Sequence, residues 1–128
     1  SKKNGLMYKL APNGTGLSGG QKQRIGIART IAGRPGIIIL DDSTSALDAA
    51  TERRLINNLN NLEGNPTKII ISQKIRTVMN ADKILLIDDG NIEAFGSHDE
   101  LIKSCDAYIE LNKLQRQEDS HEKKTVCD

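Results

Sequence analysis

Three short aliphatic runs, each of strand length and set apart by helix-length segments, constrain most strongly what this chain can fold into. They are Ile37–Leu40, Thr67–Ser72 and Lys83–Asp88. The first run is aliphatic at every position, which is typical of a strand buried on both faces of a parallel sheet. Alternation of strands with helices predicts an α/β fold in which helices flank a parallel sheet.

Capping residues and helix breakers predict where the helices begin and end. Ser18 is a good N-cap for a helix that carries an apolar stripe and ends near Gly33. Asp48 is the predicted N-cap of a second helix, which the segment 64–66 (Gly-Asn-Pro) breaks. A short helix is expected between the second and third strands.

The C-terminal part of the chain predicts a hairpin followed by a helix. Asp89-Gly90 is a strong two-residue turn signal, so residues 91–96 should return antiparallel to the third strand. Ser97 and Glu100 have capping-box spacing and predict a helix that runs to about Leu114. Residues 115–128 are charged and polar and predict a frayed tail.

Composition excludes several classes of protein and leaves one question open. The longest aliphatic run has four residues, so no membrane span is expected within these 128 residues. The two cysteines match no metal-ligand spacing and favour a reducing compartment. Ser1–Arg34 holds seven basic and no acidic residues, whereas the rest holds 11 basic and 17 acidic ones. This basic segment fits either an anionic partner or a solvated surface.

The segment Leu17–Arg24 (LSGGQKQR) carries the sharpest chemical signal. A serine and two glycines at a helix start expose backbone N–H groups and allow a ligand to approach closely. The helix dipole adds partial positive charge at the same place, which suits a phosphate oxygen. Ser-Gly-Gly alone would be read as an ordinary glycine-rich helix cap.

The octet resembles the signature motif of the ATP-binding cassette (ABC) ATPases, and the motifs downstream agree with that family in order and spacing. Ile37–Asp41 resembles Walker B, Ser45–Asp48 the D-loop, and Ser72–Lys74 the switch loop. The resemblance covers about Leu17–Leu111 and is closest to the nucleotide-binding domains of exporters.

The resemblance implies a fold, a domain organisation and a set of ligand contacts. The fold is part of a P-loop NTPase (RecA-like) parallel sheet with flanking helices, followed by the hairpin and helix. Residues 1–34 would be the signature region of the helical subdomain, 35–114 part of the RecA-like core, and 115–128 the tail. In this family two nucleotide-binding domains pair head to tail. Three kinds of contact follow for ATP and Mg²⁺, through these residues: Ser18, Gly19, Gly20 and Gln21 to ATP held by the partner, Ser45 and Asp48 in the D-loop, and Asp41 to Mg²⁺ through water.

The Walker A motif G-x-x-x-x-G-K-[ST] does not occur in the sequence. In the family its strand lies between those at Thr67–Ser72 and Lys83–Asp88, so the sheet is expected to be incomplete. The chain is therefore expected to be a C-terminal portion of a nucleotide-binding domain, soluble and inactive by itself. The full-length parent would be a transport ATPase joined to transmembrane domains at the cytoplasmic face of the membrane.

Two positions depart from the family pattern. Asp42 stands where the family usually has the glutamate that polarises the attacking water, and Gln73 stands where it usually has a histidine that contacts the γ-phosphate. Aspartate is one methylene shorter, and glutamine cannot carry charge or shuttle a proton. Together they suggest the degenerate-site subunit of a heterodimeric exporter, in which the partner would supply the competent site.

The sequence is also compatible with two other functions. The basic first segment would suit a soluble, nucleic-acid-associated ABC ATPase, although no direct nucleic-acid contact is expected from the exporter-like spacing. Asp42, Gln73 and the missing Walker A would also suit a non-catalytic interaction fragment. Homodimer or heterodimer is not decided by the sequence.

Overall fold

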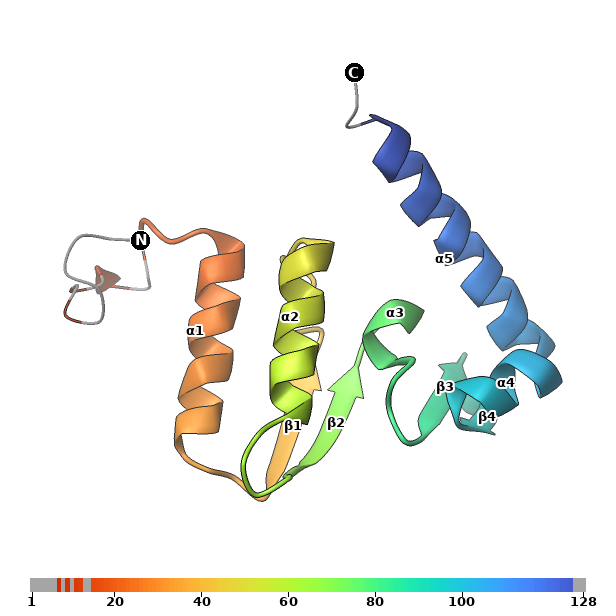
Figure 1. Ribbon diagram of the computed structural model, residues 1–128, viewed down its shortest axis with the longest axis horizontal. Helices are drawn as coiled ribbons and strands as arrows, with labels where there is room; N and C mark the ends of the chain where they lie inside the picture. The colour runs from red at the N-terminus through yellow and green to blue at the C-terminus, as the bar shows by residue number, and fades with distance from the viewer. Residues whose placement is uncertain (1–6, 8, 10, 13–14, 126–128) are drawn as a thin grey trace. The chain divides into compact units, whose positions relative to one another are not determined.

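The computed structural model describes residues 15–125 together with residues 7, 9, 11 and 12, and side chains as far as Gln117. The chain divides into two compact units, Ser1–Ile71 and Ser72–Asp128. Each unit is a small α/β structure built around its own core (Figure 1).

The first unit alternates helices and strands in the predicted order. Helix α1 (Gly19–Ala32) precedes β1 (Ile37–Asp41), and α2 (Ala49–Asn60) precedes β2 (Thr67–Ile71). The two strands are parallel, with Ile37 opposite Thr67 and Asp41 opposite Ile71. Ser18 and Asp48 are the N-caps of the two helices, as their side-chain chemistry predicts.

Both helices of this unit cover the same face of the sheet (Figure 1). Ile38 and Leu40 point into a core that α1 and α2 close with buried side chains, namely Ile27, Ile56 and Leu59. The alternate strand side chains are exposed, with Ile37 at 60% and Ile39 at 61%. The prediction of a strand buried on both faces is therefore wrong for this structure, because among the described residues only one layer of helices packs on the sheet.

The second unit contains the hairpin and the C-terminal helices. After α3 (Ile75–Val78), strand β3 (Ile84–Asp88) pairs antiparallel with β4 (Asn91–Gly96). Asp89 and Gly90 connect them with φ angles of 44° and 78°. Positive φ at both central residues is what the favoured two-residue hairpin turn requires, so the predicted turn is confirmed.

The helix predicted to run from Ser97 to about Leu114 is two helices. The capping box at Ser97 and Glu100 begins α4 (His98–Ser104), Cys105 has extended backbone, and α5 follows (Asp106–Thr125). Helix α5 therefore continues beyond Gln115, into the segment that was expected to be a frayed tail. Its regular i to i+4 bonding begins with the Ile109 N–H and the Cys105 carbonyl (3.0 Å).

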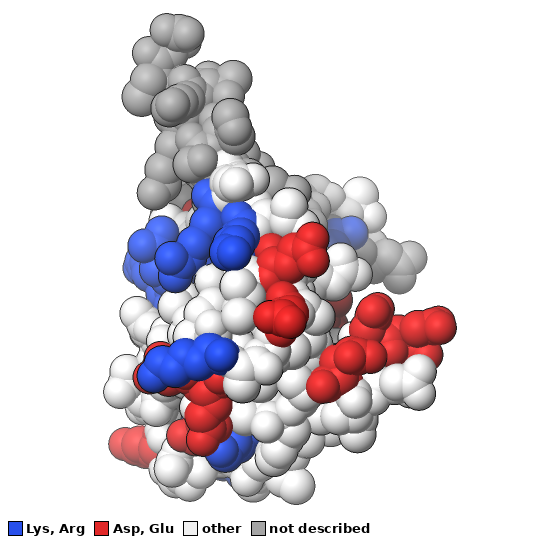
Figure 2. Space-filling view, turned by 90° about the vertical axis from the view of Figure 1, so that its right-hand side faces the viewer, with Lys and Arg blue, Asp and Glu red and all other residues white. Residues whose placement is uncertain are grey.

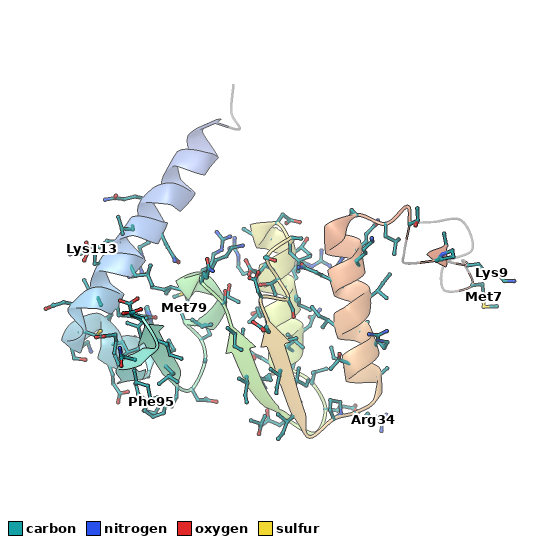
Figure 3. All side chains as sticks on the ribbon, turned by 180° about the vertical axis from the view of Figure 1, so that it is seen from behind. Met7, Lys9, Arg34, Met79, Phe95 and Lys113 are labelled. Carbon is teal, nitrogen blue, oxygen red and sulfur yellow. The ribbon has the colours of Figure 1, made fainter. Side chains whose placement is uncertain are left out.

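The core of the second unit joins α3, β3, α4 and α5 through the buried side chains of Ile75, Ile84, Leu101 and Tyr108. Tyr108 is 1% exposed, and its hydroxyl lies 2.8 Å from His98 Nδ1. His98 is thus half-buried, and its ring connects α4 to α5 through this contact. On the other face of the hairpin, Phe95 is 67% exposed (Figure 3).

The fold is therefore mixed α/β, with a small parallel sheet, an antiparallel hairpin and flanking helices. Among the described strands, β1–β2 and β3–β4 form separate sheets. The parallel sheet thus consists of two described strands, β1 and β2. Within the described part of the chain, no helix is both long and apolar enough to cross a membrane.

Candidate functional site

The N-terminus of α1 combines a neutral cap with an open run of backbone amides. Ser18 Oγ accepts from the Gln21 N–H (3.3 Å), and Gln21 Oε1 accepts from the Ser18 N–H (3.0 Å). This capping box fixes the helix start without placing a carboxylate there. The first helical amides, at Gly19 and Gly20, are among those with no acceptor inside a helix. The partial positive charge of the helix end is therefore available to an anion.

The loop that follows β1 is tied to α1 by Gln23, a residue for which the sequence indicated no role. Gln23 Nε2 donates to Ser45 Oγ (3.2 Å), and Gln23 Oε1 accepts from the Ala46 N–H (3.2 Å). Ser45 Oγ in turn donates to the Asp42 carbonyl (3.0 Å). Gln23 lies one helical turn before the buried Ile27 and therefore on the inner face of α1. That spacing is the feature of the sequence from which a contact of Gln23 with the loop could have been predicted.

Gly20 lies where the loop approaches α1 closely. A Cβ at Gly20 would lie 3.0 Å from the Ala46 carbonyl oxygen and 3.2 Å from Leu47 Cδ2, and one at Gly19 would lie 3.4 Å from Ala46 Cβ. From the sequence, these glycines were expected to let a ligand approach closely or to form a glycine-rich helix cap. In the structure the second glycine is also required for packing of the loop against the helix.

We expect Gly20→Ala to destabilise the protein by about 1–3 kcal/mol, because the added methyl overpacks against a backbone carbonyl. Gly26→Ala, on the same helix, is the matched control: a Cβ there meets no described atom within 4 Å. That change should be neutral or stabilise by up to about 1 kcal/mol, since alanine favours helix. Urea unfolding of both variants measures the difference, and equal free energies of unfolding would contradict the packing role of Gly20.

A hollow of about 280 Å³ lies between the start of α1 and the start of α2. Its lining includes Ser18, Gly19, Gly20, Arg24, Asp48 and Thr51. The structure thus brings four of the predicted ligand-contact residues to one place. Arg24 adds a cation to this lining, which favours an anionic occupant.

The two helix starts in this hollow differ in charge. Asp48 Oδ1 accepts from the N–H groups of Ala50 (3.1 Å) and Thr51 (2.9 Å), and Thr51 Oγ1 donates to Oδ2 (2.7 Å). The Thr51 bonds hold the pKa of the Asp48 carboxyl below its usual range. The start of α2 is therefore compensated by its own carboxylate, whereas the neutral cap at Ser18 leaves the start of α1 for an external anion.

Asp41 and Asp42 lie at the carboxyl end of β1 and line a second hollow, of about 320 Å³. Asp42 has a left-handed backbone, with φ of 43°, which aspartate tolerates better than most residues. The Asp42 N–H donates to the Ile71 carbonyl (3.1 Å), and this bond to β2 fixes the position at which the chain leaves β1. Polar groups at the carboxyl ends of parallel strands are where ligands gather in open α/β sheets.

A magnesium ion in this second hollow would need waters and substrate phosphates as ligands in addition to the protein side chains. Within the described part of the chain, no cluster of three or more His, Cys, Asp and Glu side chains could hold a metal ion. Mg²⁺ usually keeps several waters and binds one or two carboxylates together with substrate phosphates. The exposed, adjacent carboxylates of Asp41 and Asp42 meet that requirement.

A buried pair anchors the loop between the two hollows. Thr44 Oγ1 donates to Glu52 Oε1 (2.6 Å), and both residues are almost fully buried, at 4% and 3% exposed. A buried carboxylate needs such partners. This bond was not predicted from the sequence, because an acidic residue in the first turn of a helix is normally explained by the helix dipole alone.

Gln73 belongs to the second unit, so its placement is described there alone. Its side chain is exposed, and its backbone carbonyl accepts from Gln115 Nε2 (2.7 Å). The predicted site residues therefore fall into three places: the hollow at Ser18 and Asp48, the hollow at Asp41 and Asp42, and the loop at Gln73. Ser45 lines neither hollow: its neighbour Ala46 lines the first, and Gln23, to which it bonds, lines the second.

Comparisons with known proteins agree with these motifs. The model of the ABC transporter family matches residues 3–45. A putative ABC transporter ATP-binding protein of Mycoplasma pneumoniae is 50% identical over 103 residues, which cover 80% of this chain and 16% of that protein. An ATP-dependent lipid A-core flippase of Vibrio vulnificus is 44% identical over 112 residues, covering 88% of this chain and 19% of the flippase.

A solved structure shares the fold. The structure of a bacterial Atm1-family ABC exporter with ATP bound has a TM-score of 0.73 and 36% sequence identity, covering 77% of this chain and 18% of that one. The chain thus spans less than a fifth of the length of these relatives. Over most of its length, the chain is therefore similar to a portion of ABC transporter proteins, an exporter with ATP bound among them.

Proposed function

We propose that this chain is part of the ATP-hydrolysing subunit of an ABC exporter, and that the start of α1 completes an ATP site on a partner subunit. The observation that carries the proposal is the neutral, amide-lined helix start in a hollow that also presents Arg24. Its relatives support the transport function, because they are ABC transporter proteins and an exporter with ATP bound.

The residues of the first hollow would hold the nucleotide of the partner. The amides of Gly19 and Gly20, with the Ser18 hydroxyl, donate to phosphate oxygens. Gln21 Oε1 and the Gln21 backbone N–H are engaged in the capping box, so Gln21 contributes through the N–H donors of its side-chain Nε2. Asp48 and Ser45 act in the adjoining loop, where Gln23 holds Ser45 in place.

The second hollow and the loop at Gln73 would belong to the nucleotide bound by this subunit itself. Asp41 would hold Mg²⁺ through water, and the bound ion would supply neutralisation of the developing phosphate charge. Asp42 is the candidate base and Gln73 the candidate γ-phosphate contact. Because Asp42 is short and Gln73 cannot shuttle a proton, this site binds ATP with slow turnover, and the partner would be a different subunit that bears Glu and His.

The expected partners and location follow from the exporter relatives. A second nucleotide-binding domain would pair head to tail with this one, and transmembrane domains would couple hydrolysis to transport at the cytoplasmic face of the membrane. By itself, the 128-residue chain is expected to have no ATPase activity, because it contains no Walker A sequence to cradle the phosphates.

Reconstitution of the full-length protein and its partner tests this function. We expect Mg²⁺-dependent ATP hydrolysis that is supported by lipid vesicles and unaffected by duplex DNA, with the 128-residue chain as the inactive control. Figure 2 shows one face of the molecule, on which basic and acidic side chains both occur. Hydrolysis stimulated by DNA and indifferent to lipid would instead favour the nucleic-acid-associated class.

A further inference from the structure

One side chain of α5 holds the loop of Gln73 from both sides. Gln115 Nε2 donates to the Gln73 carbonyl (2.7 Å), and Gln115 Oε1 accepts from the Ile75 N–H (2.8 Å). The two contacts span 42 and 40 residues of sequence. A single planar carboxamide therefore fixes the backbone immediately before and immediately after Lys74.

The chemistry of this contact requires a glutamine. Among the residue types of this length, only glutamine offers a donor and an acceptor on one rigid group. The N-cap position of α3 is Lys74, a residue type with no side-chain acceptor, so Gln115 supplies the acceptor for the Ile75 amide. Ser72 Oγ accepts from the Lys74 N–H (3.1 Å), which completes the bonding of the loop.

Helix α5 is itself held firmly where it presents Gln115. Tyr108 lies seven residues earlier, about two helical turns, and so on the same face of α5. It is buried among residues of α3, β3 and α4, and it bonds to His98. The position of Gln115 is thus set by packed elements rather than by the loop that it contacts.

We propose that Gln115 is a positioning residue for the γ-phosphate contact of this subunit's own ATP site, because it fixes the backbone from which Gln73 projects. This inference rests on the proposed function, in which Gln73 contacts the γ-phosphate. Only ATP carries that phosphate, so loss of the positioning weakens ATP binding and leaves ADP binding unchanged.

The test compares the Kd values of Mg-ATP and Mg-ADP for the full-length subunit and its variants. Gln115→Met keeps the length of the side chain and removes both polar contacts. This variant should raise the Kd for ATP about tenfold, because that factor corresponds to the loss of about one hydrogen bond to a charged group. The Kd for ADP should not change. Gln115→Glu removes only the donor and should act in the same direction. Lys113→Met is the matched control, on an exposed position of the same helix (Figure 3).

The Gln73→Ala variant separates the two hypotheses. It should itself raise the Kd for ATP about tenfold, and Gln115→Met should have no further effect in that background. If Gln73→Ala lowers the preference for ATP but Gln115→Met does not, the inference about Gln115 is overturned and the proposed function stands. Gln115→Met could also raise the Kd for ATP in the Gln73→Ala background, or raise the Kd for ADP as well. Either result would show that Gln115 only stabilises the fold, and would overturn the inference. If Gln73→Ala has no effect, the assignment of Gln73 to the γ-phosphate and the inference about Gln115 are both overturned.

Discussion

Ser18→Asp is expected to lower ATP hydrolysis by the full-length transporter about 100-fold. Aspartate is as good an N-cap as serine, so α1 and its capping bond to Gln21 should persist. The new carboxylate would occupy the place proposed for a phosphate group, where like charges repel by several kcal/mol. A loss of about 2.8 kcal/mol corresponds to the expected factor.

The matched control for this prediction is Ser18→Asn. Asparagine has nearly the shape of aspartate and also caps helices well, but it is neutral. We expect it to retain activity to within about threefold of the parent protein, since only the charge differs between the two variants. ATPase rates at saturating Mg-ATP decide the matter. Equal rates for the two variants would show that no anion binds at the start of α1.

Asp42→Glu combined with Gln73→His is expected to raise turnover at this subunit's own site about 100-fold. The longer carboxylate regains roughly an ångström of reach toward the water, and misplacement of that size can cost about 100-fold. Histidine can both donate a hydrogen bond and move a proton at neutral pH. The two changes act at one proposed site, so their effects should not be additive.

This gain is best measured in the Ser18→Asp background, where hydrolysis at the partner's site is expected to be suppressed. The remaining rate then reports the site that holds Asp42. Asp99→Glu, an exposed position on α4, is the matched control for the added methylene and should leave the rate unchanged. No gain from the double change would contradict the assignment of Asp42 and Gln73 as the cause of slow turnover.

Local signals in the sequence predict most of the elements correctly. The caps at Ser18 and Asp48 and the turn at Asp89-Gly90 each depend on residues within one helical turn or one hairpin, so they can be read without tertiary information. The sequence marks Ser18 and Asp48 as separate candidate ligand contacts, and the structure adds that they line one hollow. The roles of the individual site residues stay predictions.

Long-range contacts explain what the sequence did not reveal. Gln23 and Gln115 each use a carboxamide to bond backbone more than 20 residues away, and no periodic pattern marks such a partner. The exposure of Ile37 and Ile39 depends on how many helix layers cover the sheet, which an aliphatic run cannot specify. The break at Cys105 falls in a segment without glycine or proline, the residues that normally signal a helix end.

The most direct test of the central claim is a structure of the full-length protein with its partner, trapped with ATP. We expect the amide nitrogens of Gly19 and Gly20 within about 3.2 Å of a terminal phosphate oxygen of the nucleotide seated on the partner subunit. A trapped dimer in which the start of α1 faces solvent, with the partner's nucleotide bound by other residues, would contradict the account.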